Sequence, residues 1–205
     1  MKGLIVAGIG TEVGKSVASA VLCEALGWSY WKPLASGLND APAESVTVGN
    51  LLSGAEGRTF PERYLFGASL SPHIAAAMEG VTISLEELGL PDTENPLVVE
   101  LAGGVMVPLS DTATNLDLIR YLNLPVVVVS RHYLGSINHT LLTLEVLKSR
   151  DVPIYGVVFN GEELPDTERV IEQLSGVRIL GRIPTLPQVT RESVGNVAAS
   201  FRGRL

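Results

Sequence analysis

Residues 2–16 read KGLIVAGIGTEVGKS, and this stretch is the most informative part of the chain. The apolar run at residues 4–7 predicts a buried strand, and apolar residues at helical spacing after Ser16 predict a helix. The loop between them carries glycines and ends in Gly14-Lys15-Ser16. A strand, a glycine-rich loop ending in Gly-Lys-Ser and a helix are together typical of a phosphate-binding loop.

The residue types in the loop fit that task. Backbone N–H groups of the loop and the dipole of the following helix attract an anion. Lys15 would reach the outer phosphates of ATP, and the Ser16 hydroxyl would ligate Mg²⁺. We therefore expect the nucleotide to contact a continuous run that consists of Gly10, Thr11, Glu12, Val13, Gly14, Lys15, Ser16 and Val17.

The spacing of this loop is unusual. Ile9 stands where the common pattern GxxxxGK[ST] has its first glycine, and the glycines at positions 8 and 10 leave the loop with one extra residue. A glycine-rich turn that carries a surface lysine is the alternative interpretation. The strand before the loop and the helix after it favour phosphate binding.

The composition and charge restrict the classes of function. The chain has 205 residues, of which 46% are hydrophobic, and its net charge is −7. This charge argues against nucleic acid or a membrane surface as a partner, because both favour basic patches. The chain has no visible signal peptide or membrane span. We expect one domain over residues 1–205, a cytoplasmic location, and Cys23 as a small core residue.

Strand and helix patterns alternate along the whole chain. Beyond the first strand and helix, strands are predicted at 28–32, 97–100, 125–129, 154–159 and 177–180, and helices at 44–52, 74–78, 115–122, 134–150, 165–175 and 191–202. Residues 54–70 are expected to be irregular, and Ser84 with Glu87 predicts a capping box for a short helix. This alternation predicts a single doubly wound, mostly parallel α/β sheet with helices on both faces, as in phosphate-loop NTPases.

Polar side chains follow several predicted strands at the edge where open α/β sheets bind ligands. Lys32 follows the aromatic strand, and Glu100 ends an apolar strand and is a candidate Mg²⁺ ligand. Asn160 could read an adenine edge with its amide. The alternatives are a solvated strand end for Lys32 and a turn asparagine at position 160.

Other polar positions carry weaker signals. Glu44 falls in the first turn of a predicted helix. The helix dipole favours a carboxylate there, whether or not the residue has a function. His73, behind Ser71-Pro72 at a helix entrance, could bind a ligand or serve as a surface or capping residue. The glycines at 103–104 would allow a ligand close to the backbone, and free N–H groups at residues 135–138 form an anion site.

Six stretches taken together resemble the dethiobiotin synthetase family. They are GIGTEVGKS, KPLASG, SPHIAA, ELAGGVMVPLSD, GSINHTLLT and FNG, and they cover the chain from residue 3 to about 185 in the order of that family. The resemblance implies that the substrates are ATP, 7,8-diaminononanoate and CO₂ or bicarbonate. One amine forms a carbamate, the carbamate takes the γ-phosphoryl group of ATP, and the second amine closes a cyclic urea.

The resemblance also implies roles for individual residues. Lys15 and Lys32 would screen the reacting anions, and Thr11 and Ser36 would hydrogen-bond the carbamate or phosphate oxygens. The remaining implied contacts are Ser16, Glu44 and Glu100 to Mg²⁺; Asn160, Ile183 and Pro184 to the base; and Ser36, Ser71, Pro72, His73, Gly103, Gly104, Gly135, Ser136, Ile137 and Asn138 to the substrate, the last four across a homodimer interface.

The chain departs from the family pattern at three places. Glu44 stands where aspartate is common, Leu101 replaces a glycine in the EGAGG motif, and the part after Pro187 is short. The extra methylene of Glu44 changes the reach of one metal ligand, and Leu101 would narrow or stiffen the loop near the phosphates.

Two other functions compete with this interpretation. A partition-type or metallochaperone-type ATPase often carries a second lysine inside the loop, but that position is Gly10 here. An inactive nucleotide-binding regulator is the other alternative. The presence of Lys15, Lys32 and an acidic residue at both metal positions argues against it.

Overall fold

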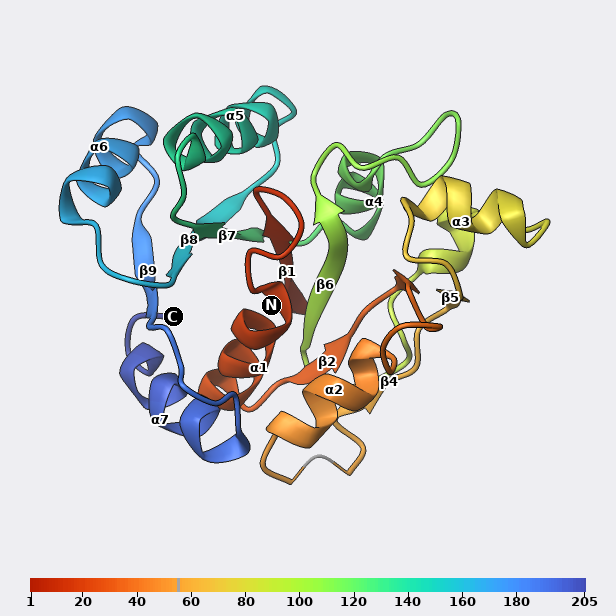
Figure 1. Cartoon of the computed structure of the whole chain (residues 1–205), viewed down its shortest axis with the longest axis horizontal. Coiled ribbons are helices and arrows are strands. Elements are labelled where there is room, and N and C mark those ends of the chain that lie inside the picture. Colours follow the sequence, from red (N-terminus) through yellow and green to blue (C-terminus); the bar gives the residue numbers. More distant parts are fainter. Residues whose placement is uncertain (55) are drawn as a thin grey trace.

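The computed structural model describes residues 1–54 and 56–205. Its main feature is a seven-stranded sheet in the order β4-β2-β6-β1-β7-β8-β9, in which every neighbouring pair is parallel (Figure 1). The strands are β1 (Gly3–Gly8), β2 (Ser29–Trp31), β4 (Thr59–Phe60), β6 (Leu97–Gly104), β7 (Val126–Arg131), β8 (Ile154–Asn160) and β9 (Ile179–Ile183).

Helices cover both faces of this sheet (Figure 1). On one face, α1 (Lys15–Leu26) packs against α2 (Glu44–Leu51) and α7 (Arg191–Phe201). The other face carries α4 (Asn115–Leu122), α5 (Ser136–Ser149) and α6 (Pro165–Ser175). The predicted doubly wound, mostly parallel α/β fold is therefore confirmed. Among the described residues, the helices are too short or too polar to cross a bilayer.

The core consists of two layers separated by the sheet. Side chains alternate between the layers along each strand, as the two-residue period of a strand requires. Leu4 and Val6 of β1 point into the layer under α1 and α7, whereas Ile5 and Ala7 point into the opposite layer. All four are fully buried, which explains the uninterrupted apolar run. Cys23 lies in the first layer and is buried, as predicted, and burial raises the pKa of its thiol.

The segment predicted to be irregular, residues 54–70, contains short strands at 59–60 and 64–66, and a further short strand precedes it at 34–36. β3 (Leu34–Ser36) pairs with β5 (Tyr64–Phe66) in a separate two-stranded parallel sheet, and β4 lies at the edge of the main sheet. Residue 55, which also falls in this segment, lies outside the described residues. Strands of two or three residues carry too little alternation to be recognised in sequence, which is why the prediction missed them.

Two strands end at least three residues later than predicted. β6 was expected to end at Glu100 but continues to Gly104, and β9 ends at Ile183 rather than Leu180. The register explains the first difference, because Val6 pairs with Glu100 whereas Gly8 pairs with Gly104. β6 thus contains an irregular stretch that follows β1 to the start of the phosphate loop.

Several local predictions are wrong. Ser84 bonds to Glu86 instead of forming a capping box with Glu87, and the segment is the 3₁₀ helix η1 (Leu85–Leu88). Ser71 followed by Pro72 predicts a serine cap for α3 (Pro72–Met78), but the Ser71 hydroxyl bonds to His73 Nδ1 at 2.8 Å rather than to the helix backbone. The apolar spacing of residues 44–52 predicts an inward-facing Val46, but this side chain is exposed. In the first two cases, a nearby side chain competes with the backbone for the serine hydroxyl.

Candidate active site

A cavity of about 700 Å³ opens beside the phosphate loop, at the carboxyl ends of β1, β2 and β6. This is the edge of the sheet where ligands are expected in open α/β folds. The cavity brings together many of the predicted site residues from separate parts of the chain. Those that line it are Thr11, Glu12, Lys15, Ser16, Lys32, Ser36, Glu44, Ser71, Pro72, Glu100 and Gly103.

The unusual spacing of the phosphate loop has a structural explanation. The Ile9 N–H donates to Val129 O at 3.1 Å, so Ile9 still follows the pairing of β1 with β7. The left-handed backbone conformations fall on Glu12 (φ 55°) and Gly14 (φ 89°), not on Ile9. A residue with a side chain is therefore accommodated where the common pattern has glycine.

Gly8 and Gly104 allow the loop and β6 to approach each other. A Cβ atom on Gly8 would lie 2.7 Å from Gly10 O and 2.8 Å from a methyl of Val13. A Cβ atom on Gly104 would lie 3.4 Å from Gly8 O. Gly104 thus packs against the loop backbone, and the cavity itself is lined by Gly103. Leu101 points into the core, so its side chain does not narrow the cavity.

Lys15 is buried beside the loop that it follows. Its ammonium donates to Gly10 O at 3.0 Å, within the backbone turn that the nucleotide phosphates would contact. Burial lowers the pKa of Lys15, and the neighbouring Lys32 ammonium adds to this effect, against the attraction of Glu100. The positive charge of Lys15 therefore faces a neutral carbonyl and is available to a phosphate.

Glu100 is the centre of a buried cluster of polar groups. Ser16 donates to Glu100 Oε1 at 3.0 Å, and the Tyr30 hydroxyl donates to Glu100 Oε2 at 3.1 Å. The Lys32 ammonium donates to Glu100 Oε1 at 3.2 Å and to Glu44 Oε1 at 2.5 Å. Glu100 is only 1% exposed. The contacts of Lys32 place it inside this cluster, which rules out the solvated strand end.

The balance of burial and charge differs between the two lysines. Burial alone would lower the pKa of Lys32, but the attraction of Glu100 and Glu44 outweighs it, so the pKa is raised. The same burial, together with the charge on Glu100, raises the pKa of the Tyr30 hydroxyl, which therefore stays protonated as a donor. Lys32 is held as an ammonium ion.

The donor set of this cluster fits Mg²⁺. The described residues contain no group of three or more His, Cys, Asp or Glu side chains that could hold a metal by themselves. Mg²⁺ needs fewer, because it is usually bound by one or two carboxylates together with substrate phosphates and water. Glu44 and Glu100 converge on one ammonium, and the Ser16 hydroxyl meets Glu100. Their oxygens suit a small hard cation at that point.

Glu62 binds the residue next to Glu44 at the start of α2, and no sequence pattern indicates this contact. It accepts the Ser45 N–H at 2.9 Å and the Ser45 hydroxyl at 2.8 Å. Glu62 thereby binds the first turn of α2, which begins at Glu44. Tyr30 was missed for the same reason, since these contacts join residues that are 17 and 70 positions apart.

Asn160 contacts the phosphate loop directly. Its Nδ2 donates to Val13 O at 2.9 Å, and a Cβ atom on Gly14 would lie only 2.1 Å from that nitrogen. Arg131, at the end of β7, donates to Glu12 O at 3.3 Å. Two strand ends therefore hold the carbonyls of the loop. This contact uses one of the two N–H groups of the Asn160 amide.

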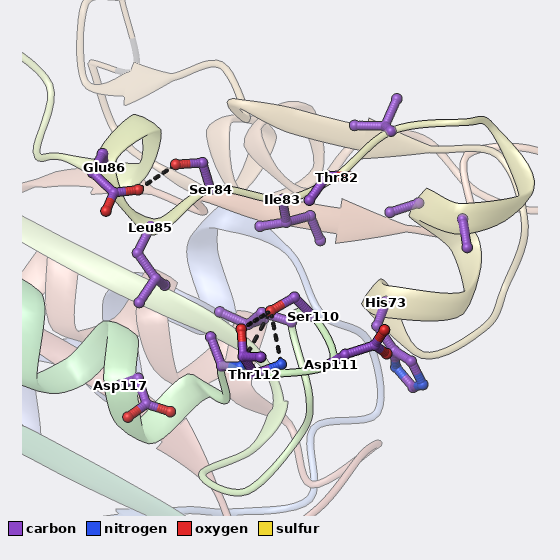
Figure 2. A pocket seen from close by; sticks show the side chains of 15 residues that line it. His73, Thr82, Ile83, Ser84, Leu85, Glu86, Ser110, Asp111, Thr112 and Asp117 are labelled. Atoms are coloured by element: carbon purple, nitrogen blue, oxygen red, sulfur yellow. Dashed lines mark hydrogen bonds between the residues drawn. The ribbon is translucent and has the colours of Figure 1, made fainter.

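Some predicted residues lie outside the main cavity. His73 lines a second cavity of about 650 Å³ together with Asp111 (Figure 2), and Lys15 and Lys32 are not among the residues of that cavity. Ile183 is buried in the core and Pro184 is exposed behind β9. Residues 135–138, at the start of α5, do not line the main cavity, and Gly135 has the left-handed φ of 103°.

The loop, the parallel sheet and the cluster around Glu100 define a phosphate-loop nucleotide-binding protein. Solved structures share the fold: the match to the ParA family ATPase of Chlorobium tepidum spans 97% of this chain and 98% of that chain (TM-score 0.60, 13% identity). The match to the cell division ATPase MinD of Pyrococcus furiosus spans 100% of this chain and 98% of that chain (TM-score 0.57, 17% identity). At these identities the similarity concerns the fold alone.

Closer relatives narrow this class to a family. A family model described as an AAA domain matches residues 2–193. The ATP-dependent dethiobiotin synthetase BioD of Brucella ovis is 44% identical over 191 residues, which are 93% of this chain and 90% of the relative. The protein of the same name from Christiangramia forsetii is 43% identical over 204 residues, covering 100% and 98%. The chain belongs to the dethiobiotin synthetase family.

The contact between Asn160 and the loop leads to a prediction about phosphate binding. Replacing Asn160 with alanine removes the bond to Val13 O, and we expect the affinity for inorganic tripolyphosphate to fall about fivefold, the value of one hydrogen bond. Tripolyphosphate has no base, so the measurement separates loop positioning from base reading. Asn196→Ala, an exposed asparagine on α7, is the control for calorimetric titration. An unchanged affinity in Asn160→Ala would contradict the positioning role.

Proposed function

We propose that this chain catalyses the ATP-dependent closure of 7,8-diaminononanoate and CO₂ to dethiobiotin, with ADP and phosphate as the other products. One observation carries the proposal. In a member of the dethiobiotin synthetase family, Lys15, Ser16, Lys32, Glu44 and Glu100 come from four separate segments and line one cavity at the phosphate loop. We take residues 1–205 as one catalytic domain that acts in the cytoplasm.

The two lysines would supply positive charge to the reacting anions. A carbamate and a triphosphate are both anions, so their approach requires positive groups placed in advance. Lys15, which faces a neutral carbonyl, would bind the phosphoryl group that moves from ATP to the carbamate oxygen. Lys32 would stabilise the charge on the other side of that group. Thr11 and Ser36 line the same cavity and can donate hydrogen bonds to the reacting oxygens.

The chemistry of the substrates sets the order of the reaction steps. A carbamate forms on one amine and its oxygen displaces ADP from the γ-phosphorus, which gives a carbamic–phosphoric anhydride. The second amine then attacks the carbamoyl carbon, loses its proton and releases phosphate as the ring closes. Fixing both amines in one cavity favours this step, because the reaction becomes intramolecular.

Mg²⁺ would be held by Ser16, Glu44 and Glu100. When bound, it would neutralise phosphate charge during transfer. Glu62 supports this function by binding the first turn of α2. Glu44 is one methylene longer than the aspartate that is common in the family. Its Oε1 lies 2.5 Å from the Lys32 ammonium, so the longer side chain extends to the cluster around Glu100.

The adenine base would lie on the other side of the loop, near Asn160 and Pro184. The free Oδ1 of Asn160 can accept from an amino group of the base, while Nδ2 stays on Val13 O. Ile183 would contribute through its backbone, since its side chain is in the core. A nucleotide switch of the ParA or MinD kind is less well supported, because the likeness to those proteins is 13–17% in sequence.

We also propose a homodimer in which the start of α5 faces the cavity of a partner subunit. Leu134, just before α5, is fully exposed. Ile137 in the first turn of α5 and Leu142 further along it add exposed apolar surface. The backbone N–H groups at residues 135–138 would then bind the distal carboxylate of the substrate. His73 and Ser71 would support that substrate from the α3 entrance.

A turnover assay tests the proposed reaction. With ATP, Mg²⁺, bicarbonate and the diamine, we expect the cyclic urea to form, as detected by mass. Lys15→Ala should lower the rate about a hundredfold or more, because it removes a charge at the transferring group. Lys2→Ala, at the opposite end of the sheet, should leave it unchanged. Absence of the cyclic urea with the unmodified protein would refute the proposal.

A Mg²⁺ titration of the same reaction tests Glu44. Glu44→Gln keeps the size of the side chain and removes its charge, so we expect the Mg²⁺ concentration at half-maximal rate to rise about tenfold. Glu87→Gln, an exposed glutamate on η1, is the matched control. If Glu44→Gln and the unmodified protein need the same Mg²⁺ concentration, Glu44 is not a ligand.

Sedimentation tests the proposed dimer. The unmodified chain should sediment as a dimer, and Leu134→Glu should shift it toward the monomer because a charge would enter an apolar interface. Val189→Glu places the same charge at an exposed site near α7 and should keep the dimer. A dimer that withstands Leu134→Glu would show that this surface is not the interface.

A further inference from the structure

Lys32 and a divalent cation would use the same oxygen atoms. The Lys32 ammonium lies 2.5 Å from Glu44 Oε1 and 3.2 Å from Glu100 Oε1. Glu100 Oε1 also accepts the Ser16 hydroxyl. These are the three groups proposed above as Mg²⁺ ligands. Two cations at one carboxylate pair repel each other strongly when they are in contact and shielded from water.

The surroundings of Lys32 leave it a second position. Its side chain is only 7% exposed, so the ion pair with Glu100 is shielded from solvent, whereas Glu44 is 29% exposed and leaves its pair open on one side. The lysine stem is flexible, and Lys32 lines the same cavity as Thr11 and Ser36. An ammonium that left the carboxylates would therefore stay in the cavity, beside the proposed reacting oxygens.

Lys15 provides the contrast within the same cavity. Its ammonium bonds to Gly10 O and makes no ion pair with Glu44 or Glu100. Loading of the carboxylates by a metal would therefore leave the contacts of Lys15 in place. The two lysines are close enough to share the same electrostatic surroundings, but only Lys32 shares ligands with a metal.

We infer that Lys32 yields the Glu44 and Glu100 oxygens to the incoming metal and moves its ammonium into the cavity. A single event then loads the metal site and frees a positive charge for the anions that react there. The identity of those anions rests on the proposed function. The exchange itself involves only Lys32, the two carboxylates and a divalent cation.

Binding of Mn²⁺ to the nucleotide-free chain tests the exchange, with free Mn²⁺ followed by electron paramagnetic resonance. Lys32→Met keeps the apolar stem and removes the competing charge, so its affinity for Mn²⁺ should be about tenfold higher than that of the unmodified protein. Lys15→Met removes one charge from the same cavity without freeing a carboxylate and should produce a smaller change. Equal affinities in the two variants would overturn the inference.

A second measurement uses the unmodified protein and so does not depend on how the variants fold. Acetic anhydride labels accessible amines, and the labelled peptides are identified by mass. Added Mg²⁺ should raise the labelling rate of Lys32 several-fold and leave that of the exposed Lys2 unchanged. A Lys32 rate that stays the same or falls would overturn the inference.

Neither measurement uses the diamine or turnover. Failure to form the cyclic urea would therefore refute the proposed reaction without affecting the exchange. Loss of the exchange would leave the proposed reaction standing, with Lys32 acting from its ion pairs.

Discussion

The buried carboxylate of Glu100 is the constraint on which the rest of the site depends. A carboxylate that is removed from water is tolerated only when its oxygens are paired. Ser16, Tyr30 and Lys32 supply the partners, from the start of α1, from β2 and from the residue after β2. Through Lys32 the pairing extends to Glu44 on α2. One buried charge thus joins the phosphate loop, the second strand and the helix that carries the other proposed metal ligand.

The position of Glu100 is set by backbone contacts that require glycine. β6 lies next to β1 in the sheet, and the shift in register brings Gly104 against Gly8. On the other side of β1, Asn160 of β8 reaches Val13 O across Gly14. The loop is therefore held between two strand ends, and its extra residue is absorbed in the continued pairing of Ile9 with β7. Side chains at Gly8 or Gly14 would force these elements apart.

The sequence was sufficient for the parts of the fold that rest on long patterns. The bounds of α4 and α6 agree with prediction because their apolar periodicity spans whole turns. β3 and β5 were missed because three residues show no period, whereas β2, of the same length, is marked by its aromatic residues. The convergence of Lys32 and Glu100 could be expected from their places at neighbouring strand ends. Glu62 could not, because its contact with Ser45 depends on how an irregular segment folds back onto α2.

The two lysines show why a shared motif does not imply a shared role. Lys15 and Lys32 both line the cavity, and a motif comparison treats each as a cation for phosphate. Burial lowers the pKa of Lys15, whose ammonium faces a neutral carbonyl. Two carboxylates raise the pKa of Lys32 and pair with its positive charge. The charges of the two lysines and the two glutamates balance. An arriving triphosphate therefore meets a cluster without net charge, and a divalent cation on the glutamates would make the cavity positive. This balance would explain how carboxylates can line a site proposed to bind anions, because their charge would recruit the metal that the anions need.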